Sequence, residues 1–340
     1  MDYVLVVVGL LLLVFAGDAM VRGAVAAALK FDMSPLLIGA TIVAVGTSAP
    51  ELFVGVDAVL KGAPTLALGN VVGSNIANIL LALGLPAIIL PISTAATGMA
   101  RTTMVMLAAT AVVLIAGMTD VYRWPTGIIF LVLLGLFVSD SIRSSRKSAL
   151  QTDTAPGVLD DEIDLEDAQK LGGLATAAFL LGGLVGVIVG ADFLVRGAVS
   201  IAMKFGVSEA VIGLTLVAIG TSLPELATAL IAAFKGHGDV AIGNIIGSNI
   251  FNLFGIIGAS ALVGDIPVPA DFWAFDFWVM VAASLVLLPF CVAKIPIGRI
   301  AGFIMFSCYC AYIWATAQAA LDQKPLPTGI AVNQAKAATL

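Results

Sequence analysis

The sequence predicts an all-α polytopic membrane protein, with ten transmembrane helices arranged as two inverted-topology five-helix repeats. The first observation is composition, since 60% of the 340 residues are hydrophobic and only 11% are charged. The second is the recurrence of apolar runs of about 20 residues, the length that an α-helix needs to cross a bilayer. The third is a stretch of sequence that occurs twice, once in each half of the chain.

Ten apolar runs are long enough to span a membrane. The chain starts with Met1-Asp2-Tyr3, without the basic segment or the small-residue cleavage site of a signal peptide, so we expect its first run to be a span. The predicted spans lie near residues 3–29, 34–61, 65–90, 97–117, 124–141, 171–203, 208–234, 238–263, 272–292 and 296–320.

Two long polar stretches predict the domain organisation. Residues 142–170 contain basic residues followed by an acidic run, and they separate the first five spans from the last five. We therefore expect a first five-helix repeat at 1–141, a loop at 142–170, a second five-helix repeat at 171–320 and a flexible tail at 321–340.

The two halves of the chain are copies of one another. Residues 17–84 align with residues 191–258 without a gap, and nearly half of the aligned positions are identical. Because each copy contains an odd number of spans, the second copy must cross the membrane in the opposite direction. The shared polar positions include Asp18/Asp192, Arg22/Arg196, Lys30/Lys204, Glu51/Glu225, Lys61/Lys235, Asn70/Asn244, Ser74/Ser248 and Asn78/Asn252.

Lysine and arginine residues predict the orientation, because they are more frequent in cytoplasmic loops than in external ones. With the N-terminus outside, most of them lie on the inner side, including Arg101, Arg143 and Lys147. We therefore expect a multi-pass protein of the cell (inner or plasma) membrane, with both termini outside and the loop 142–170 in the cytoplasm.

The duplicated region contains the sequence GTSAPE at residues 46–51 and GTSLPE at residues 220–225. A proline within a helix frees carbonyl oxygens one turn earlier, here near Ala44–Gly46 and Ala218–Gly220. Charged residues at mid-membrane depth usually face a partner, a cavity or an ion path. Carboxylate, hydroxyl and carbonyl oxygens together are the ligands that hard cations prefer. The alternative is a pair of proline kinks with hydroxyls bonded to their own helices, but a kink alone needs no glutamate.

A second motif, GNxxGSNxxN, follows at residues 69–78 and 243–252. Its serine and its last asparagine are four residues apart, so they share one face of a helix. The middle asparagine lies on another face, and we expect it to bond to backbone or to a neighbouring helix. Polar contacts between helices are the alternative interpretation for any one of these residues. The residues concerned are Ser74, Asn75 and Asn78 in the first copy, and Ser248, Asn249 and Asn252 in the second.

Together, GTSxPE followed by GNxxGSNxxN in each half resembles the two α-repeats of the cation/calcium exchanger superfamily, and most of all its prokaryotic sodium/calcium exchangers. The resemblance covers both repeats and the ten-span plan. It implies discontinuous helices around a central metal-ion site between the second, third, seventh and eighth spans. The ligands that it implies are the carboxylates of Glu51 and Glu225, the hydroxyls of Thr47, Ser48, Thr221, Ser222, Ser74 and Ser248, the carbonyls of Ala44 and Ala218, and the side chains of Asn78 and Asn252.

The sequence departs from some members of the superfamily. Certain members carry aspartate at one of the positions that are Asn78 and Asn252 here, and potassium-dependent relatives rely on an additional acid. The absence of that acid argues against potassium coupling. The loop 142–170 is also too short to contain the calcium-sensing domains of animal exchangers.

The resemblance implies a secondary active antiporter that exchanges Na⁺ for Ca²⁺ by alternating access and normally extrudes Ca²⁺. Both ions would be substrates at the central site, and we expect no cofactor, no nucleic-acid partner, a lipid environment and a monomer. Exchange of Ca²⁺ or another divalent cation for protons, carried on Glu51 and Glu225, is the alternative. A Ca²⁺ channel is a further alternative, although channel filters are usually rings of identical subunits. We expect no enzyme, since HExxH and GxSxG are absent from the sequence.

Several charged residues fall outside the expected site. Asp57 has Ile231 at the equivalent position of the second copy, and it is either a vestibule acid or a helix-end residue that reaches solvent. The acids at 160–167 lack the spacing of an EF-hand, so we interpret them as a solvated surface. Two acid–base pairs are one helical turn apart and are predicted to form ion pairs within their helices, Asp18–Arg22 and Asp192–Arg196.

Overall fold

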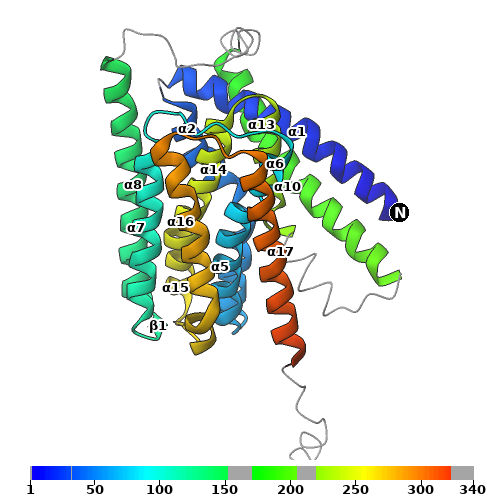
Figure 1. The fold of residues 1–340 in the computed structure, drawn as a ribbon, viewed down its shortest axis with the longest axis vertical. Helices are drawn as coiled ribbons and strands as arrows, with labels where there is room; N and C mark the ends of the chain where they lie inside the picture. Colours follow the sequence, from blue (N-terminus) through cyan, green and yellow to red (C-terminus); the bar gives the residue numbers. More distant parts are fainter. Residues whose placement is uncertain (1, 32, 152–170, 205–219, 323–340) are drawn as a thin grey trace, which may run out of the picture.

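A computed structural model describes residues 2–31, 33–151, 171–204 and 220–322 of the chain (Figure 1). Within these ranges the protein is a bundle of long helices with one short two-stranded sheet, β1 and β2. Ala218 and the acidic run at 160–167 lie outside the described residues, so the predictions for them are not tested by the structure.

The first repeat begins with α1 (Asp2–Lys30) and ends with α8 (Trp124–Gln151), which continues past the predicted end of its span at 141. Between them lie α2 (Pro35–Ile38), η1 (Gly39–Val43), α3 (Ala44–Thr47), α4 (Ala49–Leu60), α5 (Pro64–Leu80), α6 (Gly84–Ile89), α7 (Met99–Gly117) and β1 (Val121–Tyr122), where η denotes a π-helical segment.

The second repeat begins with α10 (Gly173–Lys204) and ends with α17 (Arg299–Asp322). Between them the described elements are α13 (Leu223–Phe234), α14 (Gly238–Ile250), η3 (Phe251–Ile256), α15 (Ile257–Val263), β2 (Ile266–Pro267), η4 (Phe272–Asp276) and α16 (Phe277–Ala293).

Most predicted spans are present as membrane-length helices. The described residues include 8 helices long and apolar enough to cross a bilayer. The predicted span at 34–61 is a broken pair, Pro35–Thr47 and Ala49–Leu60, bent by 44°. Only residues 220–234 of the span predicted at 208–234 are described, and they contain the short apolar α13. The count of ten spans therefore stays a prediction.

The two repeats are inverted relative to each other, as the packing of α1 against α10 shows. Gly9 near the start of α1 lies against Gly190 and Leu194 of α10, whereas Gly23 further along α1 lies against Leu180. Where α1 begins and α10 ends, Lys204 forms an ion pair with Asp2. The equivalent first helices of the two repeats are thus antiparallel, side by side at the right of Figure 1. Glycines on both helices allow this close approach of backbones.

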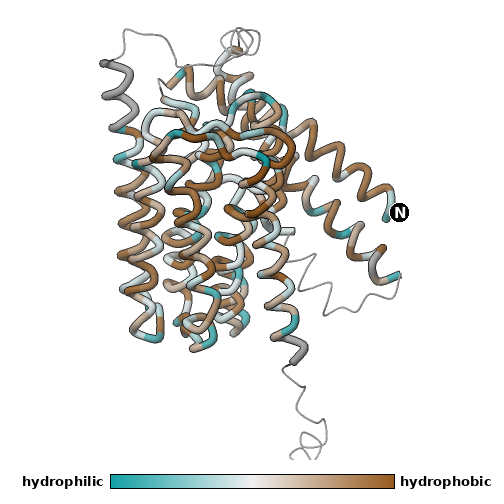
Figure 2. Tube along the Cα trace, viewed as in Figure 1, coloured by the Kyte–Doolittle hydropathy of each residue, from teal (hydrophilic) through white to brown (hydrophobic). Residues whose placement is uncertain are grey.

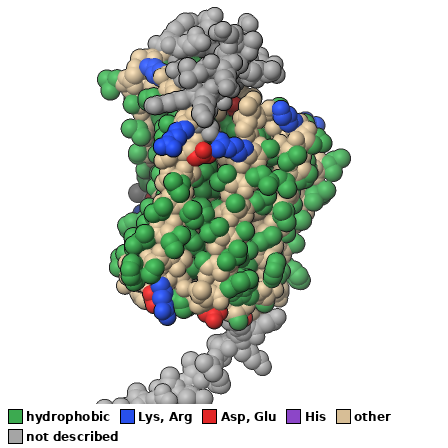
Figure 3. Space-filling view, turned by 90° about the vertical axis from the view of Figure 1, so that its left-hand side faces the viewer, with side chains coloured by type: hydrophobic (Ala, Val, Ile, Leu, Met, Phe, Trp, Pro, Cys, Tyr) green, Lys and Arg blue, Asp and Glu red, His purple; other side chains and the backbone are tan. Residues whose placement is uncertain are grey.

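The exterior of the bundle is apolar over its middle. Large hydrophobic side chains of α1, α8 and α17 are exposed, including Phe15 (70%), Leu136 (60%) and Ile300 (79%). Figure 2 shows these outer helices as mostly hydrophobic, and Figure 3 shows charged side chains at two levels with a broad hydrophobic surface between them. A soluble protein rarely exposes so large an apolar surface, and a bilayer accounts for it. The chain is therefore a multi-pass membrane protein.

The helix at 238–263 lies at the centre of the bundle. An apolar 18-residue stretch of this helix is 100% buried, whereas the corresponding stretch of α17 is 17% buried. A Cβ atom built on Gly243 would lie 2.3 Å from the carbonyl oxygen of Leu36, and one built on Gly247 would lie 2.3 Å from that of Ala40. Only glycine permits this approach, because any side chain there would collide with backbone. The contact brings the broken helix of the first repeat against the second signature motif of the second repeat.

Candidate metal-ion site

Both copies of the GTSxPE motif have the same backbone conformation at their serine. Ser48 separates α3 from α4 with φ −88° and ψ 9°, and Ser222 precedes α13 with φ −88° and ψ 4°. In each copy the proline occupies the first turn of the following helix, where its missing N–H causes no loss of a hydrogen bond. The glutamates, Glu51 and Glu225, lie in that same first turn and are fully buried.

The carboxylate of Glu225 accepts hydrogen bonds from both repeats. The Ser48 hydroxyl of the first repeat donates to Oε1 at 2.8 Å, and the Ser248 hydroxyl of the second repeat lies 3.5 Å from the same oxygen. The other carboxylate oxygen, Oε2, has no partner among the described residues. One oxygen of Glu225 is therefore held in place, and the other is available to a ligand.

Thr47 joins the broken helix to α14. Its hydroxyl donates to the Asn244 side-chain oxygen at 3.2 Å and lies 3.4 Å from the carbonyl oxygen of Ala44. The Ser248 hydroxyl lies 3.5 Å from the Thr47 hydroxyl and 3.5 Å from the same Ala44 carbonyl. The structure thus gathers hydroxyl, amide and carbonyl oxygens of the two repeats around one point, as a cation site requires.

Many polar atoms around these residues are buried without a partner, although buried polar groups are normally hydrogen-bonded. Both carboxylate oxygens of Glu51 are unpaired among the described residues, and so are the Ser222 hydroxyl and the whole Asn252 side-chain amide. All three residues have 0% of their surface exposed. Ser48, three residues before Glu51, donates to Glu225, so the two carboxylates lie in the same part of the bundle. Two neighbouring buried carboxylates with unpaired oxygens form a site that a positive ion would complete.

The asparagines of the GNxxGSNxxN motifs connect the two repeats. Asn78 donates to the side-chain oxygen of Asn249 at 3.0 Å, and Asn249 donates to the backbone carbonyl of Asn75 at 3.3 Å. The expected contact of Asn249 with a neighbouring helix is therefore confirmed. Since the Asn78 amide nitrogen is used in this contact, its unpaired Oδ1 is the atom that could bind an ion.

The remaining predicted ligands lie in the same motifs. Ser74 is 4% exposed on α5, and Thr221 is partly exposed in the turn before α13. Two residues near the site were not among the expected ligands. Asn244 accepts from Thr47, and Asn70 donates to the backbone carbonyl of Glu51 at 3.4 Å. Their recurrence in both copies, one turn before each serine, was the signal that could have identified them.

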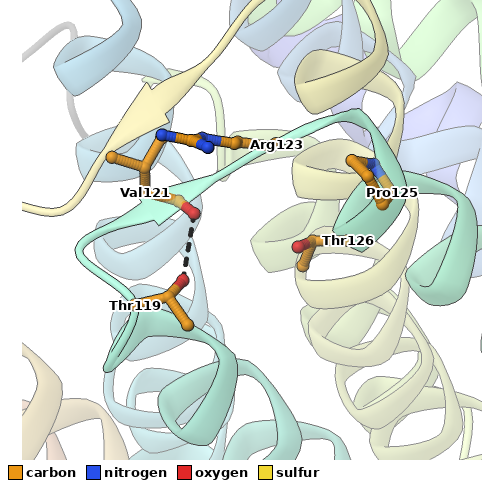
Figure 4. Close-up of a pocket in the computed structure, with 5 residues that line it drawn as sticks. All are labelled: Thr119, Val121, Arg123, Pro125 and Thr126. Atoms are coloured by element: carbon orange, nitrogen blue, oxygen red, sulfur yellow. Dashed lines mark hydrogen bonds between the residues drawn. The ribbon is translucent and has the colours of Figure 1, made fainter.

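A shallow surface pocket lies away from these residues, at the connection between α7 and α8 (Figure 4). It is lined by Thr119, Val121, Arg123, Pro125 and Thr126, none of them a predicted ligand. Arg123 is itself 3.7 Å from the carboxylate of Asp265. This pocket belongs to the loop between α7 and α8 and is separate from the buried polar residues of the two motifs.

The inverted repeats and the broken helix at Ser48, with a buried acid in each copy of the motif, define the class of protein. This combination is the architecture of secondary transporters that work by alternating access. Residues 1–142 and 175–317 match the family described as sodium/calcium exchanger protein, and the chain belongs to that family.

Individual relatives cover almost the whole chain. It is 37% identical over 328 residues to the putative antiporter CaxA of Alkalimonas amylolytica, covering 91% of this chain and 96% of the relative. It is 31% identical over 340 residues to the sodium/calcium exchanger MaX1 of Methanosarcina acetivorans, covering 92% and 97%. Among solved structures, the sodium-calcium exchanger NCX_Mj, soaked with zero Na⁺ and Ca²⁺, aligns with a TM-score of 0.78 at 32% identity, covering 93% of this chain and 98% of NCX_Mj.

Proposed function

We propose that this chain is a secondary active Na⁺/Ca²⁺ antiporter whose transported ions bind between Glu51 and Glu225. The observation that carries the proposal is the environment of the two carboxylates. Both are fully buried, three of their four oxygens lack a partner among the described residues, and the fourth, Oε1 of Glu225, accepts from hydroxyl donors of both repeats. Membership of the sodium/calcium exchanger family supports the same function.

The proposed ligands are those of the two repeated motifs. Besides the glutamates they are the hydroxyls of Thr47, Ser48, Ser74, Thr221, Ser222 and Ser248, the side chains of Asn78 and Asn252, and the carbonyls of Ala44 and Ala218. Ala218 lies outside the described residues, and its inclusion rests on its equivalence to Ala44 in the sequence repeat. All of these are oxygen donors, the type of ligand that Na⁺ and Ca²⁺ share.

Charge explains why the two ions exchange. Two ionised glutamates contribute a charge of −2, which one Ca²⁺ or two Na⁺ neutralise. An uncompensated pair of charges in an apolar interior costs several kcal/mol per ion. The occupied carrier can therefore change conformation more readily than the empty one, so ions cross in opposite directions in turn. Ca²⁺ leaves the cell when Na⁺ enters down its gradient.

We infer that the protein lies in the cell membrane as a monomer, with both termini outside. Most loop lysines and arginines lie on the inner side in this orientation. A cysteine replacing Ser148, on a background without Cys291, Cys308 and Cys310, should react with impermeant reagents from the cytoplasmic side alone. Labelling from outside intact cells would reverse the topology.

The function is tested by replacing each carboxylate in turn. Glu51→Gln and Glu225→Gln should each reduce Na⁺-driven ⁴⁵Ca²⁺ uptake into proteoliposomes at least 100-fold, because one carboxylate cannot neutralise a divalent ion in a buried site. Asp192→Asn is a matched control, since Asp192 is an exposed acid paired with Arg196 on α10. Either glutamine variant with near wild-type exchange would overturn the assignment of the site.

Proton-coupled exchange is tested in the same assay. Vesicles preloaded with Na⁺, K⁺ or acidic buffer should take up ⁴⁵Ca²⁺ only when Na⁺ is inside. The hydroxyl and amide oxygens near the carboxylates favour Na⁺, because a proton on a carboxylate does not need them. Uptake driven by acidic buffer alone would instead assign the coupling to protons.

A further inference from the structure

Four buried hydroxyl groups on helices away from the site follow one rule in this structure. Each donates to the carbonyl one turn earlier in its own helix, which satisfies a polar group in an apolar interior. The contacts are Thr103 to Met99 (2.9 Å), Thr110 to Met106 (3.0 Å), Thr228 to Pro224 (2.7 Å) and Ser284 to Met280 (2.8 Å).

Ser260 of α15 does not follow this rule. Its side chain is 0% exposed, and its hydroxyl oxygen has no hydrogen-bond partner among the described residues. Among the described residues, one other serine has a buried hydroxyl without a partner, and it is Ser222, one of the proposed ligands. Ser260 therefore behaves like a residue of the ion site and unlike a structural serine.

The hydroxyl of Ser260 faces α4 at Gly55. A Cβ atom built on Gly55 would lie 3.3 Å from Ser260 Oγ and 2.8 Å from Ile256 Cγ2. Gly55 is four residues after Glu51, which places it about 6 Å further along α4, toward the end of that helix at Leu60. Ser260 is itself three residues from the end of α15 at Val263. It lies between the level of Glu51 and one face of the membrane.

The pair of a serine opposite a glycine is not repeated at the equivalent positions of the two repeats. The position equivalent to Ser260 in the first repeat is Pro86, and the position equivalent to Gly55 in the second repeat is Ala229. The opposite face of the bundle therefore has neither this hydroxyl nor this glycine. A packing requirement common to both repeats does not explain the pair.

We propose that Ser260 is a cation-coordinating residue on the path between the central site and the membrane face at the ends of α4 and α15. A hydroxyl oxygen beside Gly55, which follows Glu51 by one turn of α4, can replace one water of a Na⁺ or Ca²⁺ that enters or leaves. The proposal rests on the function proposed above, and it assigns a separate step to one side of the membrane.

The expected consequence is a one-sided change in apparent affinity. In Ser260→Ala, the apparent KM for ions supplied from the face at the ends of α4 and α15 should rise about fivefold, the size expected for loss of one neutral polar contact. The KM from the opposite face should stay within the error of the wild type. Separate titrations with Ca²⁺ and with Na⁺ show which of the two ions Ser260 contacts.

The test measures ⁴⁵Ca²⁺ flux in right-side-out and inside-out membrane vesicles. Ser284→Ala is the matched control, because Ser284 is equally buried but bonded to its own helix. If Ser260→Ala is poorly folded, Ser260→Cys gives the same comparison, since sulfur is a poor ligand for hard cations.

Two results would overturn the proposal. An unchanged KM on both faces would mean that Ser260 does not contact the ions. An equal increase on both faces would mean that it acts through the packing of the central site. In either case the Glu51→Gln and Glu225→Gln results stand independently, so failure of this proposal is distinguishable from failure of the proposed function.

Discussion

Each repeat has a lysine directly after the helix that carries its glutamate, and the two lysines form ion pairs with different partners. In the second repeat, Lys235 follows α13 and its ammonium lies 2.7 Å from the carboxylate of Asp18 on α1. Arg22 binds the other oxygen of Asp18 at 2.9 Å. In the first repeat, the equivalent Lys61 instead binds Asp57 of its own helix at 2.7 Å. The lysine that follows α13 thus pairs with the opposite repeat, and the lysine that follows α4 pairs with its own helix.

Two sequence differences account for this asymmetry. Where Lys235 reaches α1, Gly17 packs against Ile231, and a Cβ built on Gly17 would lie 3.1 Å from Ile231 Cγ1. At the equivalent positions of the other end, Ala191 replaces Gly17 and Asp57 replaces Ile231. The acid competes for the lysine, and the extra methyl group opposes close packing. The Lys235 side chain is accordingly 16% exposed and that of Lys61 72% exposed.

Asp57 is therefore a helix-end residue that neutralises a neighbouring lysine. Its side chain is 38% exposed and lies one turn from Lys61. The two ion pairs predicted within helices, Asp18–Arg22 and Asp192–Arg196, are confirmed. Asp18 differs from Asp192 because it also receives the lysine of the opposite repeat.

Removal of the shared acid should have the largest effect on stability. Asp18→Ala removes the carboxylate that both Arg22 and the mostly buried Lys235 contact, and should lower the free energy of unfolding by about 2 kcal/mol, between the values for exposed and buried pairs. Asp192→Ala should cost less than about 1 kcal/mol, since its pair is exposed. Thermal unfolding in detergent measures both variants, and equal shifts in the midpoint would contradict the asymmetry.

Removal of the lysines should have a smaller effect with the same direction. Lys235→Met should lower the free energy of unfolding by about 1 kcal/mol, whereas Lys61→Met should change it by less than about 0.5 kcal/mol. Methionine retains most of the aliphatic chain, so the comparison isolates the charge. The same unfolding assay in 1 M NaCl should leave the Lys235 effect largely intact, because partly buried pairs are screened less than exposed ones. A larger loss from Lys61→Met than from Lys235→Met would reverse our assignment.

Conversion of one end into the other should have the smallest effect on stability. The double variant Asp57→Ile/Ala191→Gly gives the Lys61 end the residues found beside Lys235, Ile231 and Gly17. It removes the acid that binds Lys61, so that Lys61 can pair with Asp192 instead. We expect a gain of up to about 0.5 kcal/mol and a decrease in the reactivity of Lys61 toward amine reagents. The single variant Ala191→Gly, in which Asp57 still holds Lys61, is the control. Unchanged Lys61 reactivity in the double variant would show that other contacts decide the pairing.

The sequence by itself determined the features that depend on local patterns. Apolar length predicts the spans, and Pro50 and Pro224 predict the breaks, because proline cannot continue the hydrogen bonding of a helix. Spacing of four residues predicts the pair Asp18–Arg22, since such residues are neighbours on any helix. The odd number of spans per repeat predicts the inversion that the antiparallel packing of α1 and α10 displays.

Only the tertiary structure decided which polar groups meet. Ser48 and Ser222 occupy equivalent positions with the same backbone conformation, yet Ser48 donates to Glu225 while the Ser222 hydroxyl has no partner among the described residues. Ser260 likewise has no distinguishing sequence motif, and the role proposed for it depends on its position opposite Gly55. Duplicated motifs specify the same local conformation twice. Which polar groups pair across the repeats depends instead on how closely two helices approach. Single residues such as Gly17, Ile231 and Asp57 decide that approach.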